Sequence, residues 1–359
     1  MLYLIAGFIA GAASALFLFF PAPCPEILPE WWGGIAAIDG IEKSLHVKPD
    51  RAEFFVRIGD TGYHILKGNG ETAVAGTVEG GLAAFSGNGR FHVKYQKVGD
   101  YVEFFNAAGE RFWKIDSMEY PYLSHNGKLI FLMNGDHSGI RIADYNGQVL
   151  GGGISGRTCT ALAFSDRNDF GGAGFLDGTY HIADASGKIL HGGRAPDGNM
   201  VKGIAISGNG RYAAVHYGGN RKDRIRVINT ESGSYDDAGL SHVHHSKTSL
   251  HVNDEGFCVI LDSDRMLRIS RSGRVKVSID VPAKRQGHSS VRFNGGVYAV
   301  TYTMSNGVSA LILFREDGTV LFSNEYPSES FLDASLGGGL LLLRGSDNLF
   351  CYSLGRVAR

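Results

Sequence analysis

The stretch LAAFSGNGRFHVKY, which begins at Leu82, decides the fold of this chain. Two short apolar runs flank a Ser-x-Asn-Gly turn, and the same order recurs in YLSHNGKLIFLM from Tyr122 and in GIAISGNGRYAAVHY from Gly203. Other segments of the chain, such as RIRVI at 224–228, alternate between polar and apolar residues, which is the period of a β-strand. Asn-Gly between two such runs favours a tight turn between antiparallel strands. Each copy therefore predicts a β-hairpin.

A second type of turn follows the hairpins, in which Asp or Asn precedes Gly by two to four residues and leads into another strand. It stands in IRIADYNGQVL from Ile140 and in YHIADASGKIL from Tyr180, and LILFREDGTVL from Leu311 has a related turn with Asp directly before Gly. We take the first expected strand of each repeat as its start. The repeats then begin near residues 44, 82, 120, 161, 203, 249, 290 and 331. Repeats of about 40 residues with four strands each are typical of β-propeller blades.

These repeats predict an all-β fold, a β-propeller of four-stranded antiparallel blades, with eight blades favoured and seven as the alternative. Helical repeats of similar length fail because the segments alternate over four to eight residues and are divided by Gly turns. The last copy, 331–354, supplies three strands, while the segment GIAAIDGI at 34–41 precedes the first copy. We expect this segment to complete the last blade as its outer strand and to close the domain, 34–359, into a ring.

The composition excludes some classes of protein. The 359 residues include 35 Lys and Arg against 36 Asp and Glu, for a formal net charge of -1. Proteins that bind nucleic acid usually carry a basic surface. The nearly balanced charge of this chain therefore predicts no nucleic-acid partner. Four cysteines lie far apart, which excludes a paired CxxC zinc or redox motif. They are Cys24, Cys159, Cys258 and Cys351.

The N-terminus predicts a membrane anchor. Residues 2–20 are nineteen residues without a charge, and at about 1.5 Å per residue such a helix spans roughly the hydrocarbon thickness of a bilayer. We predict a transmembrane helix over 1–21 that contacts lipid through 2–20, then a Pro/Trp linker over 22–33. A cleaved signal peptide is the alternative, but it would carry a basic residue ahead of the apolar run, and the first basic residue is Lys43.

Flanking charges and small residues extend this prediction. The amino terminus is the only positive charge near either flank of the apolar run, and Glu26 and Glu30 follow the run. This favours an N-terminus in the cytoplasm and an extracytoplasmic, periplasmic propeller. Gly7, Gly11 and Ala15 recur four residues apart. Small residues at this spacing let two helices approach closely in lipid. We therefore expect a membrane protein complex as a partner of this helix.

The most unusual local feature is SHVHHSK at 241–247. In an extended segment His242 and His244 project from one face and His245 from the other. Imidazoles at this spacing predict a candidate metal site at His242 and His244. A solvated connection between blades and a pH-sensing cluster are the alternatives.

This histidine segment connects the last strand of one blade to the first strand of the next, and such connections share one rim of a propeller. Basic and histidine side chains on these connections predict a docking rim for a protein partner. The candidates are Arg157, Lys202, His244, His245, Lys247, Lys284, Arg285 and His288. Other connections carry acids instead, namely Glu79, Asp116, Glu119, Glu329 and Asp333.

The turns carry a family resemblance. The Ser-x-Asn-Gly turns at 86–89, 124–127 and 207–210 resemble those of bacterial WD40-like, YVTN-type and TolB-like propellers. The Asp-x-x-Gly hairpins at 144–147 and 184–187 resemble those of quinoprotein-like propellers, although the recurring Trp of such blades stands at a comparable place only as Trp113. The resemblance implies the fold and a bias toward protein-binding scaffolds, and the departure argues against a quinone cofactor.

Two main function classes remain. No HExxH, GxSxG, P-loop or EF-hand motif occurs, so we favour a non-enzymatic, membrane-anchored scaffold in a membrane or envelope complex, without a cofactor. The alternative is a propeller hydrolase or lyase, or a metal or ligand sensor, with its site at the channel mouth. Its candidate residues are His244, His245 and His288, with Asp333 or Glu329 across the ring.

Overall fold

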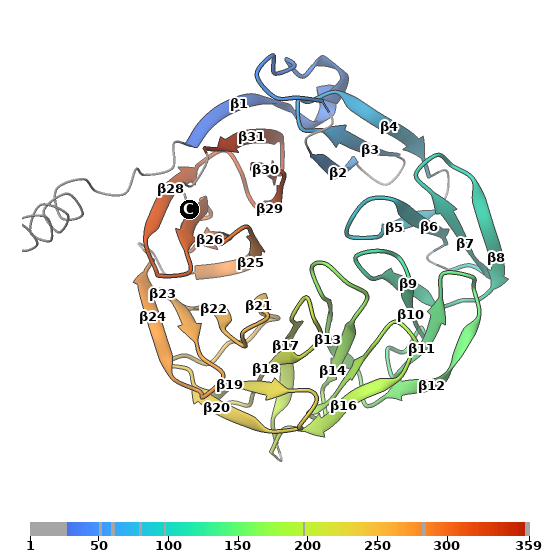
Figure 1. Ribbon diagram of the computed structural model, residues 1–359, viewed down its shortest axis with the longest axis vertical. Coiled ribbons are helices and arrows are strands. Elements are labelled where there is room, and N and C mark those ends of the chain that lie inside the picture. The colour runs from blue at the N-terminus through green and yellow to red at the C-terminus, as the bar shows by residue number, and fades with distance from the viewer. Residues whose placement is uncertain are drawn as a thin grey trace, which may run out of the picture.

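The alternating segments form eight separate antiparallel sheets that stand around a common centre like the blades of a wheel (Figure 1). The structure is a computed structural model that describes residues 27–49, 52–58, 62–78, 81–96, 98–196, 198–281 and 285–355. Within these ranges seven sheets have four strands and one has three. The prediction of an eight-bladed propeller is therefore confirmed.

The first four blades run from the inner to the outer strand in chain order. Blade 1 contains β2 (Glu53–Ile58), β3 (Gly62–Lys67) and β4 (Thr72–Thr77). Blade 2 contains β5 (Leu82–Phe85), β6 (Phe91–Tyr95), β7 (Tyr101–Asn106) and β8 (Arg111–Asp116). Blade 3 contains β9 (Tyr120–Leu123), β10 (Leu129–Met133), β11 (Gly139–Asp144) and β12 (Val149–Ser155). Blade 4 contains β13 (Cys159–Phe164), β14 (Gly171–Phe175), β15 (Thr179–Ala183) and β16 (Ile189–Arg194).

The remaining blades follow the same order, except that blade 8 takes its outer strand from the start of the described chain. Blade 5 contains β17 (Met200–Ile206), β18 (Tyr212–Gly218), β19 (Asp223–Asn229) and β20 (Tyr235–Gly239). Blade 6 contains β21 (Leu250–Val252), β22 (Cys258–Asp262), β23 (Arg265–Ile269) and β24 (Val275–Asp280). Blade 7 contains β25 (Arg285–Asn294), β26 (Val297–Met304), β27 (Ser309–Arg315) and β28 (Val320–Tyr326). Blade 8 contains β29 (Leu332–Gly337), β30 (Leu340–Gly345), β31 (Asn348–Leu354) and β1 (Ile27–Gly34).

The Ser-x-Asn-Gly turn has a local physical basis. In the turn between β5 and β6, the Ser86 hydroxyl donates to Asn88 Oδ1 at 2.8 Å, and the Phe91 amide donates to Ser86 Oγ at 3.0 Å. Gly89 has a φ of 69°, which a residue with a side chain rarely adopts. The turn is therefore encoded by three neighbouring residues, which is why it can be read from the sequence.

Apolar side chains fill the space between neighbouring blades. Between blades 5 and 6, for example, Ile225 and Val227 pack in one buried cluster with Val252 and Ile260. Burying such a side chain contributes about 1.5–3 kcal/mol. One sheet alone cannot bury both of its faces, so the radial stack supplies the core.

Three cysteines belong to this core. Cys159, Cys258 and Cys351 are free and buried, and burial raises the pKa of the Cys258 and Cys351 thiols to about 12. A thiol must lose its proton to act as a nucleophile or metal ligand. These two side chains are therefore small apolar core residues.

Strand β1 closes the ring, and it begins earlier than the sequence suggests. It pairs antiparallel with β31, from Ile27 opposite Leu354 to Gly34 opposite Asn348. Residues 35–40 form the 3-10 helix η1 (Ile35–Gly40) instead of the predicted outer strand at 34–41. The closing device is as expected, but the segment is not, and residues 27–33 are a strand rather than a linker. The bulky residues of this stretch alternate between core and solvent, which suits an outer strand.

The start of blade 1 is a second correction. Inner strands of the other blades begin within five residues of the predicted positions, but the described residues 41–49 around residue 44 form no strand. Ser44 Oγ accepts the amides of His46 and Val47 at 3.2 and 3.3 Å, which makes a local turn there. A serine hydroxyl that binds nearby amides competes with strand pairing.

Some predictions fall on residues outside the described ranges. The proposed anchor at 1–21, its Gly7, Gly11 and Ala15, and Cys24 all lie there. Among the residues that the structure does describe, no helix is long and apolar enough to cross a membrane.

The two tryptophans of β1 predict how strongly the closing strand is held. Trp31 is 5% exposed and its indole Nε1 donates to the Gly68 carbonyl at 3.0 Å, whereas Trp32 is 69% exposed. We expect Trp31→Ala to lower the free energy of unfolding by about 3–5 kcal/mol, as for other buried aromatic truncations. Trp32→Ala is the matched control and should cost less than about 1 kcal/mol. Urea denaturation measures both, and equal losses would contradict this role of β1.

His92 on β6 predicts a pH dependence of stability. Burial, together with the nearby charge of Lys94, lowers the pKa of His92 to about 4. In the unfolded chain His92 is protonated below about pH 6.5, whereas in the folded chain it stays neutral down to about pH 4. The free energy of unfolding therefore falls as the pH drops from 6.5 to 4. Between pH 7 and pH 4 we expect the free energy of unfolding of the His92→Phe variant to fall by about 3 kcal/mol less than that of the wild type. Denaturation at both pH values measures this, and parallel losses in the two proteins would refute it.

Candidate functional site: a buried polar cluster beneath one rim

One face of the ring carries the connections from the outer strand of each blade to the inner strand of the next. These include residues 117–119, 156–158, 240–249 and 327–331, and we call this face the link rim. Backbone hydrogen bonds join a connection to the hairpin between the second and third strands of the preceding blade. Ser117 N donates to Asp100 O at 2.8 Å, and Leu240 N donates to Asp223 O at 2.9 Å. The link rim is therefore a hydrogen-bonded surface rather than a set of free loops.

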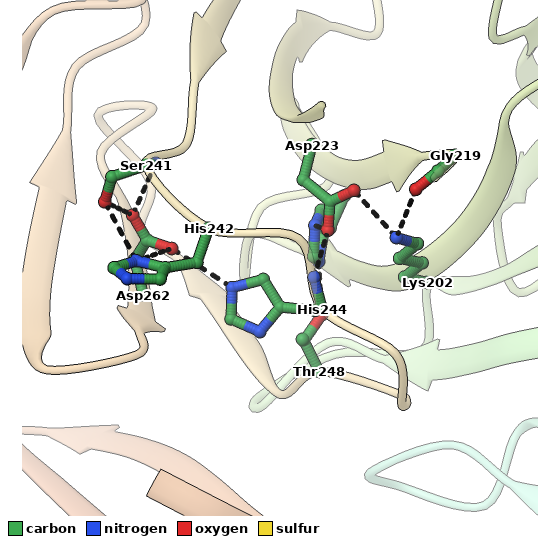
Figure 2. Close-up of polar contacts among 9 residues, drawn as sticks. Lys202, Gly219, Asp223, Ser241, His242, His244, Thr248 and Asp262 are labelled. Carbon is green, nitrogen blue, oxygen red and sulfur yellow. Dashed lines mark hydrogen bonds and ion pairs between the residues drawn. The ribbon is translucent and has the colours of Figure 1, made fainter. Parts of the chain in front are cut away.

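Asp223, at the start of β19, is the centre of a buried polar cluster beneath this rim (Figure 2). Its Oδ1 lies 2.7 Å from Lys202 Nζ of β17, and the side chains of the two residues are 0% and 6% exposed. Lys202 also donates to the Gly219 carbonyl at 3.4 Å. A buried ammonium and a buried carboxylate are each costly alone, so each requires the other.

His216 on β18 joins the second carboxylate oxygen. Its Nε2 lies 3.0 Å from Asp223 Oδ2, and its Nδ1 lies 2.6 Å from Thr248 Oγ1. Burial lowers the pKa of His216, more than the contact with Asp223 raises it. The neutral ring therefore donates from Nε2 to Asp223 and accepts the Thr248 hydroxyl at Nδ1.

The histidine connection is fastened to the same carboxylate and to a second one. The His244 amide donates to Asp223 Oδ2 at 2.8 Å, and His244 Nε2 lies 3.1 Å from Asp262 Oδ1 of blade 6. The amide and hydroxyl of Ser241 donate to Asp262 Oδ2 at 2.8 and 2.6 Å. The connection thus joins blades 5 and 6 through charge-assisted hydrogen bonds.

These contacts decide the charge of the two carboxyl groups. Burial opposes ionisation of Asp262, but hydrogen bonds from His244 and Ser241 outweigh it and lower its pKa to about 2. Burial likewise opposes ionisation of Asp223, while hydrogen bonds from His216, Lys202 and the His244 amide hold its pKa below the usual range. Both are anions at neutral pH, so the cluster is one network of compensated charge.

The order Thr248, His216, Asp223 matches the hydroxyl, imidazole and carboxylate of a nucleophile relay. Such a relay needs a hydroxyl that a substrate can reach. Asp223 and His216 are 1% and 0% exposed and Thr248 is 8% exposed. His216 and Asp223 are therefore buried behind Thr248, which lines a cavity of about 420 Å³ together with Lys202.

The predicted metal pair lies at the edge of this cluster. His242 Nδ1 is 3.7 Å from Asp262 Oδ1, so His242 and His244 do approach the same carboxylate oxygen (Figure 2). Within the described chain no group of three or more His, Cys, Asp or Glu side chains is arranged to hold a metal ion. The Nε2 of His244 is already engaged with Asp262.

The predicted docking residues divide into two sets. Lys202 and His244 are buried in the cluster, where they contact Asp223 and Asp262. Arg157, His245 and Lys247 are exposed on the connections. Lys284 and the side chains of Arg285 and His288 lie outside the description of the structure.

The acidic candidates for an enzyme site are separate from the histidines. Glu329 is 1% exposed and accepts from the Asp347 amide and the Asn348 side chain at 3.0 and 2.6 Å. Asp333 lines a central cavity and lies 3.4 Å from an Arg292 nitrogen. Neither carboxylate contacts His244 or His245, so the described structure does not assemble the predicted catalytic set.

Sequence reasoning did not find most of the cluster. Asp223, His216, Thr248 and Asp262 stand on four different elements or connections, and no linear motif joins them. The one available signal was the histidine segment itself, which contributes His244. A network assembled from two blades becomes visible only when the sheets are placed side by side.

Comparisons with known proteins give evidence about the fold. No family model matches the chain, and no curated protein sequence matches it. The crystal structure of BamB from Moraxella catarrhalis is similar, with a TM-score of 0.56 and 14% sequence identity, over 87% of this chain and 97% of that one. This likeness agrees with the β-propeller fold that the turns indicate.

The polar cluster predicts that substitutions at two aspartates of blade 5 lower the free energy of unfolding by very different amounts. Asp223→Asn removes the carboxylate charge and leaves Lys202 buried without a counter-ion, so we expect the free energy of unfolding to fall by about 3–5 kcal/mol. Asp236→Asn, on the exposed face of β20, is the control and should change it by less than about 0.5 kcal/mol. Adding Lys202→Met to Asp223→Asn should restore part of the loss. Chemical denaturation tests this, and equal effects at the two sites would sink the idea.

Proposed function

We propose that this protein is a non-enzymatic scaffold that binds protein partners of a membrane or envelope complex through the link rim. The observation that carries the proposal is the fixed state of that rim. Its connection at 240–249 is held by two buried carboxylates, while His245 and Lys247 of the same connection are exposed. A surface held in one conformation loses little entropy on binding, which favours protein recognition.

The exposed groups on the link rim supply the recognition chemistry. Arg157, His245 and Lys247 are exposed on connections that lead into blades 4 and 6. Asp116 is exposed at the end of β8, where the connection into blade 3 begins. Charges of both signs on one face orient an incoming partner and raise its association rate.

Membrane attachment is part of the same proposal. The uncharged run at 2–20 has the length of a bilayer-spanning helix, and it precedes β1, the closing strand of the ring. Gly7, Gly11 and Ala15 supply the small-residue spacing for a helix partner. We propose that the anchor places the propeller at the extracytoplasmic face of the membrane.

Reversal of rim charges tests the docking role. We expect the full-length variant Arg157→Glu/Lys247→Glu, purified in mild detergent from native membranes, to recover about tenfold less of the partners that the wild type recovers, because rim charges steer association. The difference should shrink as salt is added.

A matched control separates docking from general charge. Lys276 is exposed on the outer strand β24, away from the connections, and Lys276→Glu should leave recovery unchanged. Recovery that is the same for the wild type and the rim variant at low salt would contradict the proposal. Thermal denaturation of each variant confirms that the ring is intact.

A further inference from the structure

Blade 1 lacks a strand at its inner edge within the described residues, and its own side chains identify which strand is missing. A Cβ at Gly76 of β4 would lie 2.4 Å from the Tyr63 hydroxyl of β3, and a Cβ at Gly193 of β16 would lie 2.4 Å from the Tyr180 hydroxyl of β15. Strands β15 and β16 are the third and fourth of blade 4. By this match β3 and β4 are the third and fourth strands of blade 1, so β2 is the second.

The segment that would supply the first strand is held elsewhere. Repeat spacing places it near residue 44, but the Ser44 amide donates to the Asn69 carbonyl at 2.9 Å, and its hydroxyl donates to Glu30 Oε2 at 2.9 Å. Val47 is 4% exposed in the core between blades 8 and 1. These contacts fasten the segment beside β1 and the turn after β3.

Strand β2 therefore has one edge without a described partner. It pairs with β3 from Glu53 opposite Lys67 to Ile58 opposite Gly62, and its sheet contains β2, β3 and β4 only. In Figure 1 β2 is the strand of blade 1 nearest the centre of the ring. Alternate amide and carbonyl groups of an edge strand point away from the sheet and pair readily with another extended chain.

There is space beside this edge. A cavity of about 920 Å³ opens within the ring, and its lining includes Glu53 and Phe54 at the start of β2. Leu342 of blade 8 and Ala83 of blade 2 line the same cavity. An added strand would thus meet apolar side chains from both neighbouring blades.

We propose that an extended segment of a partner protein adds to β2 in antiparallel orientation and fills the inner position of blade 1. This mode of recognition takes its affinity from main-chain hydrogen bonds and its specificity from alternate side chains. The proposal rests on the scaffold function and names the form in which a partner binds.

The other blades indicate the chemistry of the added segment. Inner strands such as LAAF in β5 and CTALAF in β13 are short and consist mainly of small or apolar residues. The position in blade 1 is bounded by the same kind of neighbours. The segment is accordingly an extended stretch of about four to seven residues with alanine, leucine or valine at alternate positions.

Hydrogen exchange of the full chain provides the first test. In the free protein about half of the β2 amides should exchange at least tenfold faster than those of β3, because alternate groups lack a partner. A synthetic peptide with the sequence of residues 159–165, with serine in place of Cys159, is the probe. At saturation it should slow exchange in β2 about tenfold and leave the link rim unchanged. Full protection of β2 before peptide is added, or no change after it, would overturn the proposal.

Cross-linking provides the second test and fixes the position. A cysteine introduced by Glu53→Cys, in a Cys24→Ser background, should react with a bromoacetyl group on the peptide. Ala73→Cys, exposed on the outer strand β4 of the same blade, is the matched control and should not react above the rate of an unrelated peptide. Equal labelling of the two sites would overturn strand addition. It would not affect docking at the link rim, which the rim-charge variants test independently.

Discussion

Each blade of this protein has two apolar faces, and neither can be buried within the blade itself. This constraint makes the ring necessary, since a sheet at an open end would leave one face in water. Strand β1 meets the constraint by pairing with β31. Trp31 then fills the space between the last blade and the first, where it shares a buried cluster with Phe54 and Leu340.

A ring of sheets held by apolar contacts alone would leave its connections mobile. In this protein Asp223 and Asp262 hold the connection between blades 5 and 6. Asp223 accepts hydrogen bonds from His216 of β18 and from the His244 amide of the connection, and Asp262 of blade 6 accepts from Ser241 and His244 of the connection. The charge of Lys202 offsets that of Asp223 inside the ring. Core packing holds the blades in place, and the buried charged side chains hold the connection between blades 5 and 6. This connection is part of the link rim, which we propose binds a partner.

Blade 1 departs from this pattern in a way that connects structure to the proposed role. Its own segment near Ser44 is held at the periphery, and the inner edge of β2 faces a cavity. Open strand edges are usually covered in stable proteins. This departure lies next to the ring closure: the region that completes the last blade adjoins a first blade with three described strands.

The repeat, the propeller fold and the turn chemistry could be read from the sequence, because Ser86, Asn88 and Gly89 act on one another within a few residues, whereas the count of eight rather than seven blades came from the structure. It also indicated that a segment before the first copy closes the ring, but it placed that strand at 34–41 rather than at Ile27–Gly34. The tertiary structure was needed to show that Lys202 and His244 are buried, that Asp223 is their common partner, and that the inner edge of β2 has no partner among the described residues. These features depend on which strands lie side by side in space. A local sequence pattern does not indicate them, because the partner carboxylate lies on another strand or another blade.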